Sequence, residues 1–501
     1  MKRDSVFIVG CVGAMVIIAS YLLSAPLNGN LQIVAAALLL VIYLVSTLLR
    51  PSVGLAIISA TLPFLGIFRR VLYQQSPVGF DPLLLVIPIY SAFLLLVIGV
   101  SYREKLKSLM RKSGTSRLLF ILIIILALQI FNPLQGGLVV GVAGALFYLV
   151  PLSWYFIGQL FLTRQAVNNI LTIFIVASII AAAYGLMQTF VGFPGYDEYW
   201  LTHGGTAYIA LNVGGGAIRA LGPTTSSAEY AALLAAGITC LWTLVVFRRQ
   251  VLAILPAVVL SIALFLESTR TAIILTVVVC ITLLVLRQKS KLVAVIVISV
   301  LCLVGAFAYQ YFSHVVYAVG PDSSSPIQRL VAHQVNGLAH PFDQSYSTGQ
   351  GHFQELIGAL GTSLHNPLGF GLGATTLSAT KFGGNSLSAE LDIPNIFISG
   401  GLIAGFLYVA ILYRTLHAGF TLAFRYKQLT DVLPLAVVAV TFGQILNGSY
   451  YSLMPFIWMF IAWIDCRATD ILVLERSSQQ PRKVLMMPLV RLEPSSSTLE
   501  Q

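Results

Sequence analysis

Charged residues are scarce in this sequence. They make up only 9% of the 501 residues, whereas hydrophobic residues make up 57%. A soluble domain carries about 25% charged residues, so this scarcity excludes an ordinary soluble globular protein. The alternating polar and apolar pattern of a transmembrane β-barrel is also missing. Uncharged apolar runs of about 18 residues or more recur instead, and such runs are typical of membrane-spanning helices.

Cysteine is rare as well, with five residues in the whole chain. None of them lies where an oxidising compartment would reach it, so we expect no disulfide bond. The Cys and His spacings typical of metal sites are missing, so we predict neither a bound metal nor another cofactor. The five cysteines lie inside apolar runs or at their cytoplasmic ends: Cys11, Cys240, Cys280, Cys302 and Cys466.

The apolar runs predict an all-α, polytopic integral membrane protein with about 14 (12–14) transmembrane helices. The first run follows Met1-Lys2-Arg3-Asp4 and is longer than the apolar core of a usual signal peptide, so we interpret it as a retained helix. Pro63 is expected to kink the third span. The expected spans are residues 5–24, 31–49, 52–68, 81–100, 117–131, 138–162, 167–192, 227–247, 250–267, 271–286, 291–312, 394–416, 433–449 and 451–465.

The distribution of Lys and Arg predicts the orientation in the membrane. With both termini in the cytoplasm, 23 of the 29 Lys and Arg residues lie on the cytoplasmic side, and the clearest cluster is the 101–117 loop. The formal charge of +11 is therefore explained by the positive-inside rule and not by a nucleic-acid partner. The six basic residues on the outer side are Arg69, Arg70, Arg219, Arg270, Arg329 and Lys381.

Two long extracytoplasmic loops interrupt the predicted transmembrane domain, which comprises residues 1–466. They are residues 193–226 and residues 313–393, and the second precedes the last three helices. Together they hold six of the seven histidines. Long loops in a compact membrane protein are usually functional. Residues 467–501 are polar and predict a disordered cytoplasmic tail.

Charged residues at the outer ends of apolar runs are candidate binding groups. Arg219 lies in Gly-Ala-Ile-Arg-Ala-Leu-Gly-Pro and offers planar, bidentate donors to an anion such as phosphate, or alternatively anchors the chain at lipid headgroups. Glu267 and Arg270 flank a polar break between two apolar runs. They form either a salt bridge with a helix cap or part of a polar cavity. The cost of ionisable groups at membrane depth favours the cavity for Arg270, whereas the structural interpretation is favoured for Glu267.

A third set of polar residues lies in the second outer loop. His352 belongs to Gly-Gln-Gly-His-Phe-Gln-Glu, and residues 366–373 form a glycine-rich turn that no predicted strand precedes, which excludes a dinucleotide-binding motif. Glu390 and Asp392 lie just before the helix expected from residue 394. Glu390 is either a general base with a raised pKa or a helix cap, whereas a cap is favoured for Asp392.

In their order along the chain, these motifs resemble the O-antigen ligase and polymerase superfamily of bacterial envelope enzymes. The resemblance covers roughly residues 115–465, and it depends on the order of the motifs and on the large outer loop. The motifs are Asn132-Pro133, Tyr184-Gly185-Leu186-Met187-Gln188, Gly192-Phe193-Pro194, Arg219-x-x-Gly222, Ser268-x-Arg270, residues 366–373 and Gly401-Leu402-Ile403-x-Gly405.

The resemblance implies a metal-independent glycosyltransferase of the bacterial inner membrane. Such an enzyme would polymerise undecaprenyl-diphosphate-linked oligosaccharide repeats into exopolysaccharide or O-antigen at the outer face. Arg219 and Arg270 would bind the diphosphate. We expect Arg329 to assist them and Glu267 to belong to the same substrate-binding site. His352 or Glu390 would deprotonate the acceptor hydroxyl. The implied partners are the polyprenyl-diphosphate-linked glycan, the lipid bilayer, and flippase and chain-length-regulator proteins.

Two departures from the family pattern bear on the activity. Ligases of the family carry His-Asn about eleven residues before the glycine at the position of Gly401, where this sequence has Glu390. This difference favours a polymerase over a ligase that transfers glycan to lipid A core. An arginine often found upstream of the Asn-Pro-Leu-Gly motif is replaced by Gly351-His352.

Two alternatives belong to other functional classes. A multi-pass transporter would place its substrate site near the bilayer midplane, whereas the ionisable residues here lie at the outer ends of the predicted helices. A non-catalytic scaffold of an assembly complex would tolerate conservative changes at Arg219 or Glu390.

Overall fold

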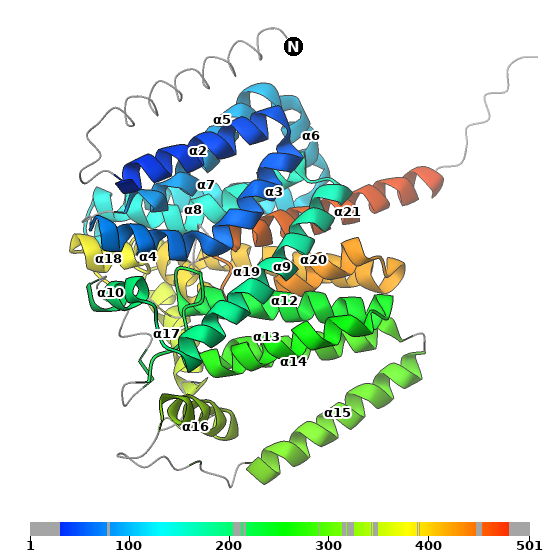
Figure 1. Ribbon diagram of the computed structural model, residues 1–501. Coiled ribbons are helices and arrows are strands. Elements are labelled where there is room, and N and C mark those ends of the chain that lie inside the picture. The colour runs from blue at the N-terminus through cyan, green and yellow to red at the C-terminus, as the bar shows by residue number, and fades with distance from the viewer. Residues whose placement is uncertain are drawn as a thin grey trace, which may run out of the picture.

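The chain is described by a computed structural model in which the defined elements are helices (Figure 1). It describes residues 31–77, 81–203, 212–213, 217–288, 290–312, 317, 325–341, 343, 349–387, 389, 391–446 and 453–479. An isolated antiparallel bridge joins Asn212 to Ile218. The prediction of an all-α, polytopic membrane protein is confirmed at this level.

The helices of the N-terminal half follow the predicted spans closely. They are α2 Leu31–Leu49, α3 Pro51–Thr61, η1 Leu62–Phe64, α4 Leu65–Gln75, η2 Pro82–Leu85, α5 Val86–Ser101, α6 Arg103–Lys112, α7 Gly114–Gln129, η3 Pro133–Gln135, α8 Leu138–Phe161, α9 Arg164–Phe190 and α10 Gly195–His203.

The C-terminal half contains the helices of the second outer loop as well as further apolar helices. They are α12 Ser227–Arg248, η4 Val251–Ala253, α13 Ile254–Glu267, α14 Arg270–Arg287, α15 Lys291–Phe312, α16 Pro326–Ala339, α17 Gly349–His365, α18 Leu377–Phe382, α19 Asp392–Tyr426, α20 Leu429–Val440 and α21 Met454–Gln479.

Within the described part of the chain, eight helices are long and apolar enough to cross a bilayer, and a ninth results if the bent pair α6–α7 is one span. The expected number of about 14 is therefore not reached. Span 5–24 lies outside the described residues. The apolar helices at spans 250–267 and 433–449 are shorter than 18 residues, and so is the apolar stretch Ile298–Phe307 within α15. The third span contains a 3-10 turn at Pro63, as expected.

The elements outside the apolar helices gather at two opposite ends of the bundle (Figure 1). In this view α10, α16 and α18 lie at the left, whereas α6 and the far end of α21 lie at the right. The turns between α12 and α13, between α14 and α15 and between α19 and α20 also lie at the right. The basic turns thus share one end, opposite to the end that carries the predicted outer loops.

The predicted basic loop 101–117 is mostly a helix. All of its charged residues except Arg117 lie on α6, which has no buried residue and meets α7 at an angle of 112°. The bend lies at Ser113, whose Oγ accepts a hydrogen bond from the backbone N–H of Ser116 (3.0 Å) and donates one to Asp465 of α21. Because an amphipathic basic helix is stable at a membrane surface, α6 is expected to lie along the bilayer.

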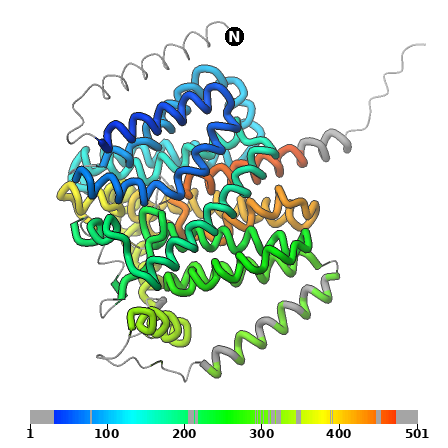
Figure 2. Tube along the Cα trace, viewed as in Figure 1, coloured from blue at the N-terminus to red at the C-terminus, as the bar shows by residue number. Residues whose placement is uncertain are grey.

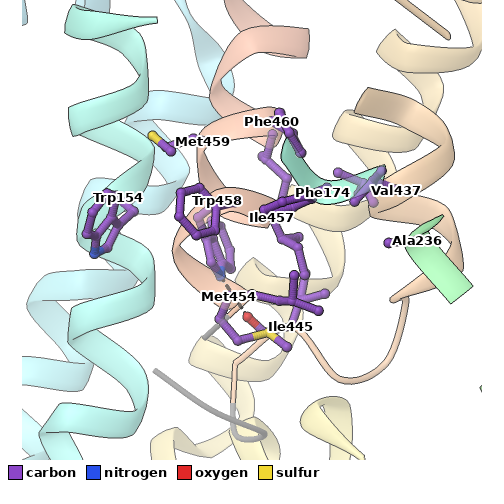
Figure 3. Packing of buried hydrophobic residues seen from close by; sticks show 14 of the residues in the cluster. Trp154, Phe174, Ala236, Val437, Ile445, Met454, Ile457, Trp458, Met459 and Phe460 are labelled. Atoms are coloured by element: carbon purple, nitrogen blue, oxygen red, sulfur yellow. Dashed lines mark hydrogen bonds between the residues drawn. The ribbon is translucent and has the colours of Figure 1, made fainter. Parts of the chain in front are cut away.

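The core is formed by large apolar side chains where α8, α9 and α21 pack together (Figure 3). Trp154 and Trp458 are completely buried, and the ring of Phe174 meets that of Phe456 edge-on at a centroid distance of 5.1 Å. The Trp458 Nε1–H donates to the carbonyl oxygen of Ile445 (2.8 Å), as the dashed line in Figure 3 shows. Ile445 lies outside a helix, so this bond gives its carbonyl the partner that it would have in a regular helix.

Helix α19 is broken at Gly401, and the glycine-rich motif fits into the break. Gly401 has φ 78° and ψ −175°, and a Cβ there would overlap the carbonyl oxygen of Pro367. The N–H of Phe370 donates to the carbonyl of Ile398 (2.9 Å), and the N–H of Leu402 donates to Pro367 (3.1 Å). Residues 366–371 therefore supply the backbone partners that the broken helix lacks.

Helix α20 ends inside the protein. It has 12 residues, which span about 18 Å and so fall short of a hydrocarbon core of about 30 Å. The chain continues as non-helical backbone in which Ile445 and Leu446 are fully buried. Both of their N–H groups donate to Oδ2 of Asp392, at 2.9 Å for Leu446. Asp392 lies in the first turn of α19, where the sequence predicts a cap, and it also pairs the backbone of this segment.

The last helix extends beyond Cys466, where the transmembrane domain was expected to end. Helix α21 continues to Gln479, and Ala468 and Ile471 pack against the core. Arg467 forms an ion pair with the buried Asp431 (3.2 Å). The helix continues because these contacts stabilise the residues that the sequence assigned to a polar tail.

Candidate functional site

Arg219 lies in a loop before α12 whose backbone is held by side chains of two other helices. Gln188 of α9 accepts a hydrogen bond from the backbone N–H of Gly222 (2.9 Å). Arg70 of α4 donates to the carbonyl oxygens of Gly222 (2.6 Å) and Thr224 (2.5 Å). The loop therefore has fixed partners for both its donors and its acceptors, although it belongs to no regular element.

A buried ion pair orients the residues that hold this loop. Nε of Arg70 lies 2.5 Å from Oδ1 of Asp197 on α10, and the two side chains are only 2% and 0% exposed. The other carboxylate oxygen accepts hydrogen bonds from Tyr184 OH (2.6 Å) and Gln188 Nε2 (2.6 Å). A buried ion pair is stable only when its remaining polar atoms are paired, and this carboxylate fulfils that condition.

Glu267 and Arg270 lie on either side of a tight turn between α13 and α14. Glu267 is completely buried and accepts hydrogen bonds from the backbone N–H (3.0 Å) and the hydroxyl (2.9 Å) of Thr269. Ser268 has φ 67°, in the left-handed region that residues other than glycine seldom adopt. Such strained residues concentrate at functional sites.

Helix α16 of the second outer loop packs across the ends of α13 and α14 (Figure 2). Nη2 of Arg270 lies 3.0 Å from Nε2 of His333 and donates to the carbonyl oxygen of the same residue at 3.0 Å. A Cβ at Gly337, one turn further on, would overlap the guanidinium group of Arg270. Glycine at this position therefore lets α16 approach the arginine closely.

His333 accepts a hydrogen bond in this contact. Burial lowers its pKa most, and together with the positive charges of Arg270 and Arg219 it brings the pKa from 6.5 to about 4. The imidazole is therefore neutral near pH 7. Because arginine has only donors, Nε2 must accept from Arg270 and the ring proton lies on Nδ1.

Arg219, Glu267, Arg270 and His333 together form what we call the arginine cluster. Arg219 lies close enough to Glu267 and to Arg270 to interact with both charges. The Nε atoms of Arg219 and Arg270 are buried and have no hydrogen-bond partner among the described residues. Buried donors are nearly always paired, and two adjacent guanidinium groups suit an anion with several oxygens.

Arg329 belongs to the helix that carries His333. It lies one turn before His333 and two turns before Gly337, so the three positions share one face of α16. Its side chain is half-buried. The structure thus places the third predicted arginine on the face of α16 that contacts Arg270.

The structure describes one of the two predicted catalytic residues. His352 is on α17, and its Nδ1 is 3.7 Å from a carboxylate oxygen of Glu355. Glu390 lies outside the described residues. The preceding residue, Ala389, is fixed because its N–H donates to Asn395 Oδ1 (2.8 Å) and its carbonyl accepts from Asn395 Nδ2 (2.8 Å).

Sequence reasoning did not select Arg70, Asp197, His333 or Gly337. The only signal for Arg70 was its place among the few outer basic residues, and Asp197 gave none. His333 and Gly337 lie four residues apart, which places them on one face if the segment is a helix. That pattern shows a shared face but not that Arg270, from another helix, lies against it.

Each motif behind the family resemblance has a defined place in the structure. Tyr184 and Gln188 contact Asp197 and the Arg219 loop, and residues 366–371 fit into the break of α19. Asn132 is connected to the same turn, because its Nδ2 donates to the carbonyl of Gly369 (2.9 Å). Models of known protein families give no match to the chain, and neither do curated proteins.

Lowering the pH from 7 to 5 is expected to release α16 from Arg270. The docked imidazole has a pKa of about 4 instead of 6.5. The released state therefore takes up a proton in this window and docking weakens as the pH falls. We expect the ratio of released to docked α16 to rise about tenfold, after allowing for the screening of a half-buried group. Pulsed electron paramagnetic resonance between labels on α13 and α16 would measure it.

The control for this experiment is His333→Gln, which cannot be protonated near neutral pH. Its distance distribution should be the same at pH 7 and pH 5. An equally large shift in this variant would mean that another group controls the docking of α16.

Proposed function

We propose that this chain is a membrane glycosyltransferase which polymerises undecaprenyl-diphosphate-linked oligosaccharide repeats into exopolysaccharide or O-antigen at the outer face of the bacterial inner membrane. The arginine cluster is the observation that supports this proposal most directly. Two guanidinium groups with buried, unpaired Nε atoms lie at the end of the bundle that carries the predicted outer loops. The oxygens of a diphosphate match such donors in charge and geometry.

The proposed reaction exchanges one bond at the anomeric carbon for another. The acceptor hydroxyl oxygen attacks the anomeric carbon of the donor sugar, the bond from this carbon to the diphosphate oxygen breaks, and the diphosphate leaves with the electron pair. Arg219 and Arg270 would stabilise the charge that develops on the leaving group. Glu390 or His352 would take the proton of the acceptor hydroxyl.

Glu267 and Arg329 would have supporting roles. The carboxyl group of Glu267 is buried beside Arg219 and, when it is ionised, offsets part of the repulsion between the two central guanidinium groups. Arg329 would bring a third set of donors from α16. A site of this kind binds the diphosphate through side chains of three separate segments, which fixes its orientation toward the acceptor.

The break in α19 is a feature that a transporter would share. Transporters often bind substrate at broken helices near the midplane, where unpaired backbone groups face the substrate. In α19, however, the N–H of Phe370 and the carbonyl of Pro367 occupy the break. Backbone groups that are already paired offer no site for a substrate, so this geometry favours the enzyme proposal.

The test is a size profile of the lipid-linked and surface glycans in a strain that lacks the protein. A polymerase predicts loss of long polymer while single repeat units are still made and exported. Long polymer that stays on its lipid carrier would indicate a ligase instead. Repeat units retained in the cytoplasmic leaflet would refute the enzyme proposal in favour of transport.

A further inference from the structure

Aromatic side chains meet where α4 passes α10. The ring of Tyr73 lies edge-on to Trp200, at a centroid distance of 5.1 Å and an angle of 80°, and 6.0 Å from Tyr199. On α10, Tyr199 stacks on His203 at 4.2 Å. Tyr73 OH also donates to the carbonyl oxygen of His203 (3.2 Å). We refer to Tyr73, Tyr199, Trp200 and His203 as the outer aromatic cluster.

Two neighbouring arginines fix this cluster in place. The Arg69 guanidinium lies 5.3 Å from the centre of the Trp200 ring and forms an ion pair with Asp81 (2.5 Å). The next residue, Arg70, binds the buried Asp197 of α10. These contacts hold α4 and α10 together next to the rings, which keeps the rings in a fixed arrangement.

The cluster differs from an aromatic anchor in the bilayer. Anchoring Trp and Tyr residues lie at the ends of spanning helices, next to hydrocarbon. Helix α10 is a nine-residue helix that does not span, and its Glu198 and Thr202 are exposed. A carboxylate remains exposed only in water or among headgroups. The half-exposed rings of this helix therefore lie in water or among headgroups and not in hydrocarbon, whereas Tyr73 lies near the end of the candidate span Pro51–Gln75.

The cluster is adjacent to the elements that hold the arginine cluster. Tyr73 follows Arg70 by three residues on α4, and Trp200 follows Asp197 by three residues on α10. Each ring is thus about one helical turn, or about 5 Å along the axis, from a residue that orients the Arg219 loop.

We propose that the outer aromatic cluster binds the sugar rings of the lipid-linked glycan whose diphosphate lies at the arginine cluster. This inference rests on the proposed function. A pyranose ring has an apolar C–H face that stacks on an aromatic face, and hydroxyl groups at its edge that bond to polar neighbours. Exposed His203 and Glu198 supply such neighbours. Rings of this kind fit a carbohydrate better than they fit a lipid chain.

The experiment uses the full-length protein in nanodiscs of phosphatidylethanolamine and phosphatidylglycerol. The probe is the free oligosaccharide repeat, released by mild acid from the cell's own lipid-linked pool and therefore without phosphate. Binding is measured by calorimetry and by saturation-transfer NMR. We expect Trp200→Leu together with Tyr73→Leu to weaken binding about tenfold or more, and Trp200→Phe to stay within about threefold of wild type.

The chain contains a matched control in α19. Tyr413 and His417 also form a Tyr–His stack one turn apart, at 5.9 Å, and Tyr413 is 67% exposed. Tyr413→Leu should therefore leave glycan binding unchanged. Arg219→Ala should also leave binding of the free oligosaccharide nearly unchanged, because this probe has no diphosphate.

The outcomes separate this inference from the proposed function. No binding by the wild-type protein, or equal binding by the wild type and the Leu double variant, would overturn the inference that the outer aromatic cluster binds the glycan. A double variant that does not run as a single species on gel filtration is replaced by the single variant Trp200→Leu, for which weaker binding than in Trp200→Phe is then required. Normal polymer in cells with alanine at Arg219 and Arg270 would refute the proposed function alone.

Discussion

Alanine at Arg219 or at Arg270 is expected to reduce the yield of long polymer about 100-fold, and alanine at both should leave none. Each arginine would stabilise the diphosphate as it leaves, and the loss of one such preorganised donor typically costs about 100- to 1,000-fold in rate. The structure leads to the same expectation, because the Nε atoms of both arginines are buried and have no hydrogen-bond partner among the described residues. The measurement is the size profile of surface glycan in a deletion strain that carries each variant.

Charge and shape can be separated at the same positions. Lysine keeps the charge but lacks the planar fork of arginine, so Arg219→Lys and Arg270→Lys should retain only part of the activity. Arg248→Ala is a matched control, because Arg248 is exposed at the opposite end of α12. Normal polymer in the double alanine variant, at normal protein level in the membrane, would show that the diphosphate binds elsewhere.

The largest loss of stability is expected from breaking the Arg70–Asp197 pair. Asp197→Ala leaves the guanidinium of Arg70 buried beside an apolar side chain, and such a buried, unpaired charge costs about 3–5 kcal/mol. The donors of Tyr184 and Gln188 lose their acceptor at the same time. Thermal unfolding in detergent should therefore show a large fall in Tm.

A double variant distinguishes the charge from its positioning role. In Arg70→Met with Asp197→Leu no unpaired charge is left, so much of the lost stability should return. Polymer should nevertheless stay low, because the carbonyl groups of Gly222 and Thr224 have lost their donor and the Arg219 loop is no longer held. Recovery of both stability and polymer would mean that the pair has no positioning role. Glu104→Ala, which breaks an exposed ion pair on α6, should leave Tm unchanged.

The parts of the fold that the sequence could predict are those with local signals. Long apolar runs identify most of the helices, because each run must satisfy its own backbone in lipid. The number of spans is not confirmed where hydropathy continues but the helix stops, as at Val440. This helix can end early because Asp392 pairs the backbone that follows it. Asp392 lies about 50 residues earlier in the chain, and no local sequence pattern indicates this contact.

The candidate site was predictable to the same extent. Arg219, Glu267 and Arg270 are charged residues at the ends of apolar runs, where a charge is costly and therefore informative. Their proximity in space could only be guessed. Arg70 and Asp197 are 127 residues apart, and the contact of Arg270 with His333 joins a span to a helix of the outer loop. Such long-range pairs depend on how whole helices pack, which composition and periodicity do not determine.

Asp392 also has a consequence for the biogenesis of the protein. The N–H groups of Ile445 and Leu446 would face hydrocarbon if the segment after α20 entered the bilayer alone, and each unpaired group there costs several kcal/mol. The carboxylate that pairs them is at the start of α19, which is synthesised before α20. Helices α20 and α21 are therefore expected to leave the translocon as a pair that docks on α19, and a chain that ends after α20 should be recognised by membrane quality-control proteases and degraded.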